Sequence, residues 1–169
     1  NALYLGDRAY GLIRLGTALA ASGDASAAAD VQRHVLDDIA ALRKATGDAP
    51  RWQAAAASSE HALAEALQAL GDAMGAARSF ERARFLRAGL IAAGQADAAT
   101  RNGLVATVLK LTELAANAGR PGPALTLLAP ALDEARALLA EAPDDPRARR
   151  TLAILHYREG ELHLQAGAT

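Results

Sequence analysis

The chain has 169 residues, of which 51% are hydrophobic and only 4% aromatic, with 18 basic and 19 acidic side chains. This apolar content and a net charge near zero exclude an intrinsically disordered chain. They also provide no long-range field to attract nucleic acid or an anionic membrane, so we expect neither partner. The absence of cysteine excludes disulfide frameworks, thiol catalysis and cysteine-based zinc sites.

Apolar and small residues recur every three to four positions in seven segments, which is the period of amphipathic α-helices. Glycine, proline or aspartate lies in the breaks between these segments. The expected helices span residues 2–21, 25–45, 51–70, 73–93, 99–118, 122–141 and 147–166. The sequence therefore predicts an all-α fold of three helical hairpins and one closing helix. No segment has the ~18 to 20 uninterrupted apolar residues of a transmembrane helix.

Four glycines follow one another at intervals of 48 residues, and the residues around them recur in register: Gly23, Gly71, Gly119 and Gly167. The fifth residue after each of the first three glycines is alanine, and other small or apolar positions repeat beside it. We expect each glycine to end a helix in the left-handed conformation. Asp24, Asp72 and Pro121 then begin the next helices. A period between 20 and 50 residues indicates a solenoid of stacked units.

The period also defines the expected domain organisation. We predict one domain over residues 1–169, built from repeats at about 1–48, 49–96 and 97–145 and a half repeat at 146–169. The chain starts at Asn1 without a signal-like segment and stops at Thr169 just after a repeat glycine, so we expect it to be a piece of a longer polypeptide. In the absence of an export signal we expect a cytoplasmic location.

This arrangement resembles the tetratricopeptide repeat (TPR), whose pattern is Trp-x2-Leu-Gly-x2-Tyr, then Ala-x3-Phe, then Pro. The first copy matches it at Leu12, Leu15, Gly16, Leu19, Gly23, Ala28 and Val35, and the second at Leu63, Ala64, Leu67, Gly71, Ala76, Phe80 and Ala83. The third matches it at Val108, Leu111, Thr112, Ala115, Gly119, Ala124, Leu128 and Ala131. The period of 48 exceeds the family's usual length of about 34, and Ala40, Ala88 and Arg136 replace the closing proline. The chain is therefore similar to the long-hairpin variety found in large bacterial signalling and regulatory proteins.

The resemblance implies a right-handed superhelical α-solenoid of about three TPR-like repeats, in which the first helix of each hairpin lines a concave surface that binds a partner. It places Thr17 and Ala62 on this surface together with the predicted partner-binding residues, which are Tyr10, Arg14, His61, Glu65, Lys110, Glu113, Tyr157 and Arg158. The implied function is a non-catalytic scaffold that binds a protein segment or partner domain within a larger bacterial protein. Only Lys110 suits the chaperone-binding subset of the family, so we exclude that ligand.

Two alternatives to the peptide groove remain open. Lys110 with Glu113, and Arg158 with Glu161, are spaced as ordinary i,i+3 surface pairs that need no ligand. A different class of function is a structural assembly module, in which the terminal helices mediate homo-oligomerisation through apolar faces. Those faces contain Leu152, Leu155 and Leu162 on the last helix and Leu3 and Leu12 on the first.

Catalytic and metal-binding patterns are weak. The sequence contains no nucleophile, zinc-protease, phosphate-loop or dinucleotide signature, so we predict neither an enzyme nor a cofactor; an enzyme would need Glu60, His61 and Glu65 to form its site. His156, Glu159 and His163 share one helical face, but a third fixed ligand is missing, so we predict no metal. We expect His34 and His61 to be isolated and to face solvent, and Trp52 to be a packing anchor.

Overall fold

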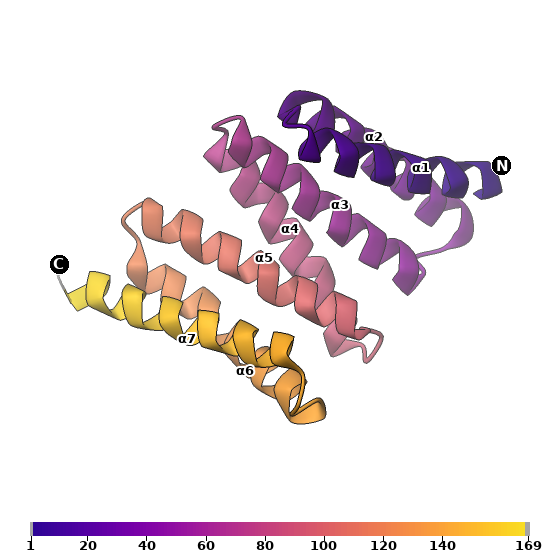
Figure 1. Cartoon of the computed structure of the whole chain (residues 1–169). Helices are drawn as coiled ribbons and strands as arrows, with labels where there is room; N and C mark the ends of the chain where they lie inside the picture. Colours follow the sequence, from indigo (N-terminus) through magenta and orange to yellow (C-terminus); the bar gives the residue numbers. More distant parts are fainter. Residues whose placement is uncertain (1, 168–169) are drawn as a thin grey trace. The chain divides into compact units, whose positions relative to one another are not determined.

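In the computed structural model, the backbone is described for residues 2–167 and the side chains for residues 5–9 and 11–167. This part of the chain contains seven α-helices and no strand (Figure 1). The helices are α1 (Ala2–Ala21), α2 (Ala25–Thr46), α3 (Pro50–Ala69), α4 (Ala73–Ala92), α5 (Ala98–Asn117), α6 (Pro121–Glu141) and α7 (Pro146–Gly167). The predicted helices are confirmed to within one residue at every end. Over the described residues, none of the helices combines the length and the apolar character needed to span a membrane.

The glycine turns repeat in three dimensions as they do in the sequence. Gly23, Gly71 and Gly119 have φ angles of +85°, +82° and +68°, which is the left-handed conformation that glycine adopts without strain. At each turn the N–H of the glycine and the N–H of the next residue donate to carbonyl groups in the last turn of the preceding helix. This pair of bonds satisfies carbonyls that would otherwise have no partner at the helix end.

Aspartates begin three of the helices, as the sequence predicts for the first two hairpins. The side chain of Asp24 accepts a hydrogen bond from the N–H of Ala27 at 3.0 Å, and that of Asp72 accepts one from Gly75 at 2.8 Å. The two aspartates share nearly the same backbone angles, with φ/ψ of −81°/75° and −82°/75°. The first two hairpins therefore use the same local turn, because the same residue types stand at the same spacing.

The repeated positions are also buried in register. Three positions of each hairpin's second helix, namely the fifth, ninth and twelfth residues after the glycine, are at most 3% exposed in all three copies. They are Ala28, Gln32 and Val35 on α2, Ala76, Phe80 and Ala83 on α4, and Ala124, Leu128 and Ala131 on α6. The small side chain at the first of these positions lets neighbouring helices approach closely.

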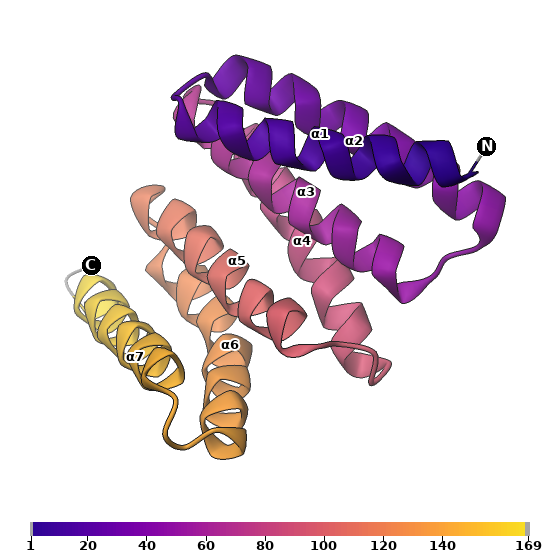
Figure 2. The same ribbon diagram turned by 45° about the vertical axis from the view of Figure 1, so that its right-hand side comes forward.

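The chain divides into two compact units, at residues Asn1–Ala96 and Asp97–Thr169. In unit 1, α1 packs on α2, α2 on α3 and α3 on α4, with a smaller contact between α1 and α3 (Figures 1 and 2). Its core contains Val35, Ile39 and Leu42 from α2 together with Trp52 and Ala56 from α3. Trp52 is 7% exposed, which confirms that this residue is a packing anchor.

In unit 2, α6 packs on both α5 and α7. Leu155 and Leu162 of α7 are completely buried, because this side of α7 packs on α6. An ion pair also joins α5 to α6, because the Arg101 guanidinium contacts the carboxylates of Glu134 and Glu141. Hydrogen bonds to these two carboxylates raise the pKa of Arg101 above its ordinary value.

Two features of the helices depart from the expected pattern. Pro130 lies inside α6, on an exposed position, and the helix continues through it. Leu15, a framework position of the first copy, is 47% exposed, whereas its equivalent Leu63 is 5% exposed. The difference arises because α3 has α2 and α4 on its two sides, whereas the described contacts of α1 are with α2 and α3 alone.

Candidate functional site

The residues predicted for the partner surface in unit 1 lie on α1 and α3. Arg14 is exposed on α1, whereas the side chain of Tyr10 lies outside the described part. His61 and Glu65 form a pair across one turn of α3, with Nε2 and Oε1 3.7 Å apart. The His61 side chain is 18% exposed and meets Phe80 edge-on, with ring centroids 5.1 Å apart. The expectation of an isolated, solvent-facing His61 is therefore wrong.

A pocket of about 300 Å³ lies between α1, α2 and α3, and we call it the α1–α3 pocket. Its lining includes three positions that the resemblance assigns to the partner surface, which are Thr17, Ala62 and Glu65. Most of the other lining residues are glycine or alanine. The pocket exists because these small side chains leave the space between the helices unfilled.

Gln32 supplies the polar interior of the α1–α3 pocket. Its side chain is 3% exposed, and its Oε1 atom accepts no hydrogen bond within the described part of the chain. Gly16 makes room for this amide, because a Cβ atom at Gly16 would lie 2.5 Å from Gln32 Nε2. The pocket thus combines apolar walls with one buried acceptor, the usual composition of a small recognition site.

In unit 2 the predicted residues form two separate charged groups. On α5, Lys110 Nζ lies 4.0 Å from Glu113 Oε2. On α7, Arg158 Nη1 lies 3.0 Å from Glu161 Oε2, and Tyr157 is exposed. A hydrogen bond to the Glu161 carboxylate, reinforced by its negative charge, raises the pKa of Tyr157. The i,i+3 surface pairs of the alternative interpretation are therefore present.

The leucines of α7 that were predicted to mediate assembly are mostly buried within unit 2. Leu155 and Leu162 are buried and Leu152 is half-buried, because this side of α7 packs on α6. On α1, Leu12 is half-buried and the side chain of Leu3 lies outside the described part. The prediction of an apolar pairing face made of Leu155 and Leu162 is therefore wrong. The large apolar side chains that α7 does expose are Ile154, Tyr157 and Leu164.

Side chains considered for metal binding or catalysis do not assemble into one site. His156 Nδ1 lies 3.1 Å from Glu159 Oε2, and His163 is exposed. Over the described ranges, no group of three or more histidine, aspartate and glutamate side chains is placed to hold a metal ion. Glu60 and Glu65, which an enzyme would need together, line different cavities.

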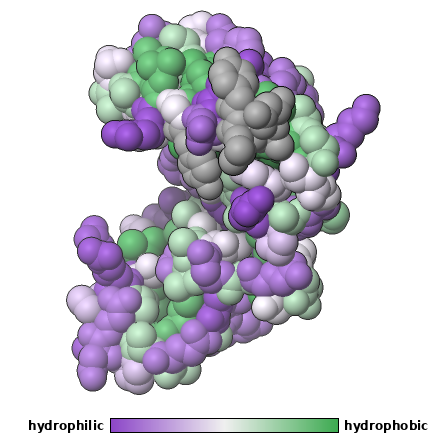
Figure 3. Space-filling model, turned by 90° about the vertical axis from the view of Figure 1, so that its right-hand side faces the viewer, coloured by the Kyte–Doolittle hydropathy of each residue, from purple (hydrophilic) through white to green (hydrophobic). Residues whose placement is uncertain are grey.

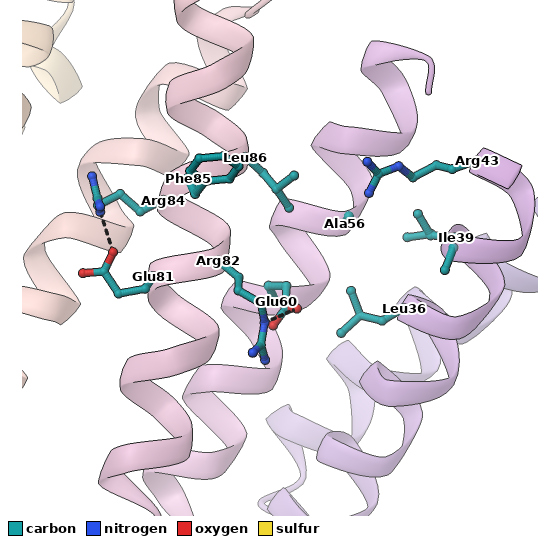
Figure 4. Close-up of a pocket in the computed structure, with 11 residues that line it drawn as sticks. Leu36, Ile39, Arg43, Ala56, Glu60, Glu81, Arg82, Arg84, Phe85 and Leu86 are labelled. Atoms are coloured by element: carbon teal, nitrogen blue, oxygen red, sulfur yellow. Dashed lines mark hydrogen bonds and ion pairs between the residues drawn. The ribbon is translucent and has the colours of Figure 1, made fainter. Parts of the chain in front are cut away.

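A second cavity of unit 1, of about 580 Å³, was not predicted from the sequence. It is a groove between α2 and α4 whose floor is α3, and we call it the α2–α4 groove (Figure 4). Leu36 and Ile39 form one wall, Phe85 and Leu86 the other. These four apolar residues are not among the small and glycine positions that define the repeat. Large apolar side chains at other positions of the second helices α2 and α4 are therefore the sequence signal that could have indicated the groove.

Comparisons with known proteins assign no family to the chain: no family model matches it, and no curated protein does. The TPR resemblance therefore stays a prediction. The space-filling view in Figure 3 shows apolar and polar side chains intermixed on that face of the molecule.

Proposed function

We propose that the chain is a non-catalytic, TPR-like scaffold that binds a peptide segment or partner domain. In this proposal the hairpins form a right-handed α-solenoid, and the first helices α1, α3, α5 and α7 present the binding surface. The chain would act within a larger bacterial signalling or regulatory protein in the cytoplasm. The repeated turns and the in-register burial of the second helices support the repeat architecture.

The observation that carries the proposal is the α1–α3 pocket. It opens between two first helices, at positions that the TPR resemblance assigns to ligand contact. Its volume of about 300 Å³ is at the lower end of the range of about 300–1,000 Å³ that ligand pockets occupy, and it is sufficient for one side chain of a partner. The buried Oε1 atom of Gln32 offers an acceptor to a donor on that side chain.

The test compares two exposed alanines of α1 that differ in their relation to the pocket. Ala20 lines the pocket, whereas Ala18 does not, and leucine suits a helix at both positions. In pull-downs from a bacterial lysate, we expect the wild type and Ala18→Leu to retain a protein that Ala20→Leu and Arg14→Glu lose. Thermal melting shows that all four proteins are folded. Identical captured proteins for Ala18→Leu and Ala20→Leu would contradict the proposed pocket.

Self-assembly is the second candidate function, through the exposed Ile154, Tyr157 and Leu164 of α7. These three side chains are at positions i, i+3 and i+10, so they lie on one side of α7, and a shared apolar face can mark an interaction surface. Light scattering over a range of protein concentrations measures the mass directly. A mass that stays at one chain excludes this candidate, and one that rises and is reduced by Leu164→Glu supports it.

A further inference from the structure

The α2–α4 groove has the composition of a recognition site, although it lies outside the predicted partner surface. Its apolar lining consists of Leu36 and Ile39 on the α2 wall, Ala56 on the floor, and Phe85 and Leu86 on the α4 wall (Figure 4). Phe85 stands on α4 and is 73% exposed. An aromatic side chain this exposed beside an open apolar groove is the kind of anchor found in protein interfaces.

One buried polar group lies in this groove. Glu60 is 7% exposed, and its Oε1 atom accepts a hydrogen bond from Arg82 Nε at 2.6 Å. Its Oε2 atom is buried and has no hydrogen-bond partner in the described part of the chain. Figure 4 shows the carboxylate between Arg82 and Leu36. A buried carboxylate oxygen without a donor is unfavourable, so an occupant that supplies a donor gains affinity there.

The charges around the groove decide what kind of donor fits. Three arginines, Arg43, Arg82 and Arg84, line it, and each is paired with a carboxylate, which belongs to Asp48, Glu60 or Glu81 respectively. A lysine or arginine entering the groove would compete with Arg82 for Glu60 and would add a positive charge to a lining that contains three arginines and two glutamates. An acidic side chain would bring a negative charge beside Glu60. A neutral aromatic group with an N–H donor avoids both penalties, and arginine favours the face of such a ring.

We propose that the α2–α4 groove is a second docking site, which takes a tryptophan side chain of a partner protein and accepts its indole N–H at Glu60. Tryptophan buries a large apolar surface and has one hydrogen-bond donor, the indole N–H. It is also among the residues that dominate binding at interfaces. The volume of about 580 Å³ leaves room for the neighbouring residues of the partner segment. The groove shares with the proposed scaffold function only the class of ligand, a protein segment.

The probe is N-acetyl-tryptophanamide, titrated into the full chain while backbone amide resonances are followed by NMR. We expect saturable shifts centred on Ala40, Ala56 and Phe85, rather than on the α1–α3 pocket around Gly16 and Ala62. Shifts centred on the α1–α3 pocket, or no shift at millimolar probe, would overturn the proposal. Because the two cavities have no lining residue in common, failure here is distinguishable from failure of the proposed scaffold function.

The indole N–H is tested with the 1-methyl derivative of the same probe. We expect N-methylation to weaken binding about tenfold or more, since the bond to a charged acceptor is lost. In Glu60→Leu the two probes should bind equally; if that variant fails to fold, Glu60→Gln should show a smaller N-methylation effect than the wild type. An unchanged effect in either variant, or a phenylalanine analogue that binds as tightly, would overturn the assignment.

Steric blocking provides a control that leaves the core intact. Ala40 lines the groove, and Ala41, its exposed neighbour on α2, does not. We expect Ala40→Phe to abolish probe binding and Ala41→Phe to leave it unchanged. Equal binding by the two variants would overturn the site. Tighter binding of free indole than of N-acetyl-tryptophanamide would also overturn the partner-protein occupant, because it would indicate a small-molecule pocket.

Discussion

Replacing Gly71 with alanine tests the physical basis of the repeat. Gly71 has φ of +82° and ends the turn between α3 and α4. A Cβ atom there would meet nothing within 4 Å, so the cost comes from the backbone conformation alone. Left-handed backbone costs a non-glycine residue about 1–2 kcal/mol. Alanine recovers about 0.4–1 kcal/mol by restricting the unfolded chain, so we expect a net destabilisation of about 1 kcal/mol.

Gly89 provides the matched control. It lies inside α4, where a Cβ atom also meets nothing within 4 Å and the φ angle is not positive. Alanine is favoured over glycine inside a helix by about 0.8–1.0 kcal/mol, so Gly89→Ala should stabilise the protein. The two substitutions add the same methyl group to unit 1 and have opposite expected signs.

Urea unfolding followed by tryptophan fluorescence measures both effects. Trp52 is the single tryptophan of the chain and is buried in unit 1, the unit that contains both glycines. Asparagine tolerates the left-handed conformation better than alanine does, so Gly71→Asn should lie between the wild type and Gly71→Ala. A neutral Gly71→Ala, or a destabilising Gly89→Ala, would refute the explanation by backbone conformation.

Three further predictions concern the helices. Asp24→Ala and Asp72→Ala should each cost about 1 kcal/mol of unfolding free energy in urea, and a markedly unequal pair would show that the two caps are not equivalent. Pro130→Ala should raise the melting temperature measured by circular dichroism, because the free energy of unfolding should rise by up to about 3 kcal/mol. An unchanged or lower melting temperature would show that the helix is adapted to proline. Hydrogen bonds from Thr100 lower the pKa of Asp97 in the folded state, so the folded state binds fewer protons than the unfolded state. The capping bond therefore stabilises the fold fully above the ordinary pKa of about 4. This stabilisation is lost as the pH falls through the lower pKa of the folded state. Unfolding of Asp97→Asn between pH 7 and 3 should therefore depend less on pH, and equal pH dependence of the two proteins would contradict the capping role.

The helices were predictable because local signals agree with one another. Glycine, aspartate and proline mark the ends, and apolar residues at helical spacing mark the bodies. The framework positions followed from the 48-residue register, because a small residue that recurs at one place in every copy indicates a close helix contact. Ala28, Ala76 and Ala124 show this directly, since all three are buried.

The sites were harder to predict because they depend on contacts between helices. No pattern in the chain indicates that Phe80 covers His61, since the two residues lie on different helices. The pairing of Glu60 on α3 with Arg82 on α4, in the lining of the α2–α4 groove, has no local signal either. The buried side of α7 was misassigned for the same reason, because Leu155 and Leu162 face α6 rather than a second copy of the chain.

The position of Asp97 has a consequence for how chains of this kind change in length. It is the first residue of unit 2, and it caps α5 through the N–H of Thr100 at 2.7 Å. The beginning of the period thus carries its own helix-start signal, as it does one period earlier, where Pro50 begins α3. Duplication or loss of one 48-residue period that begins at Asp97 would keep this cap with its helix, whereas an insertion between Asp97 and Thr100 would separate the two.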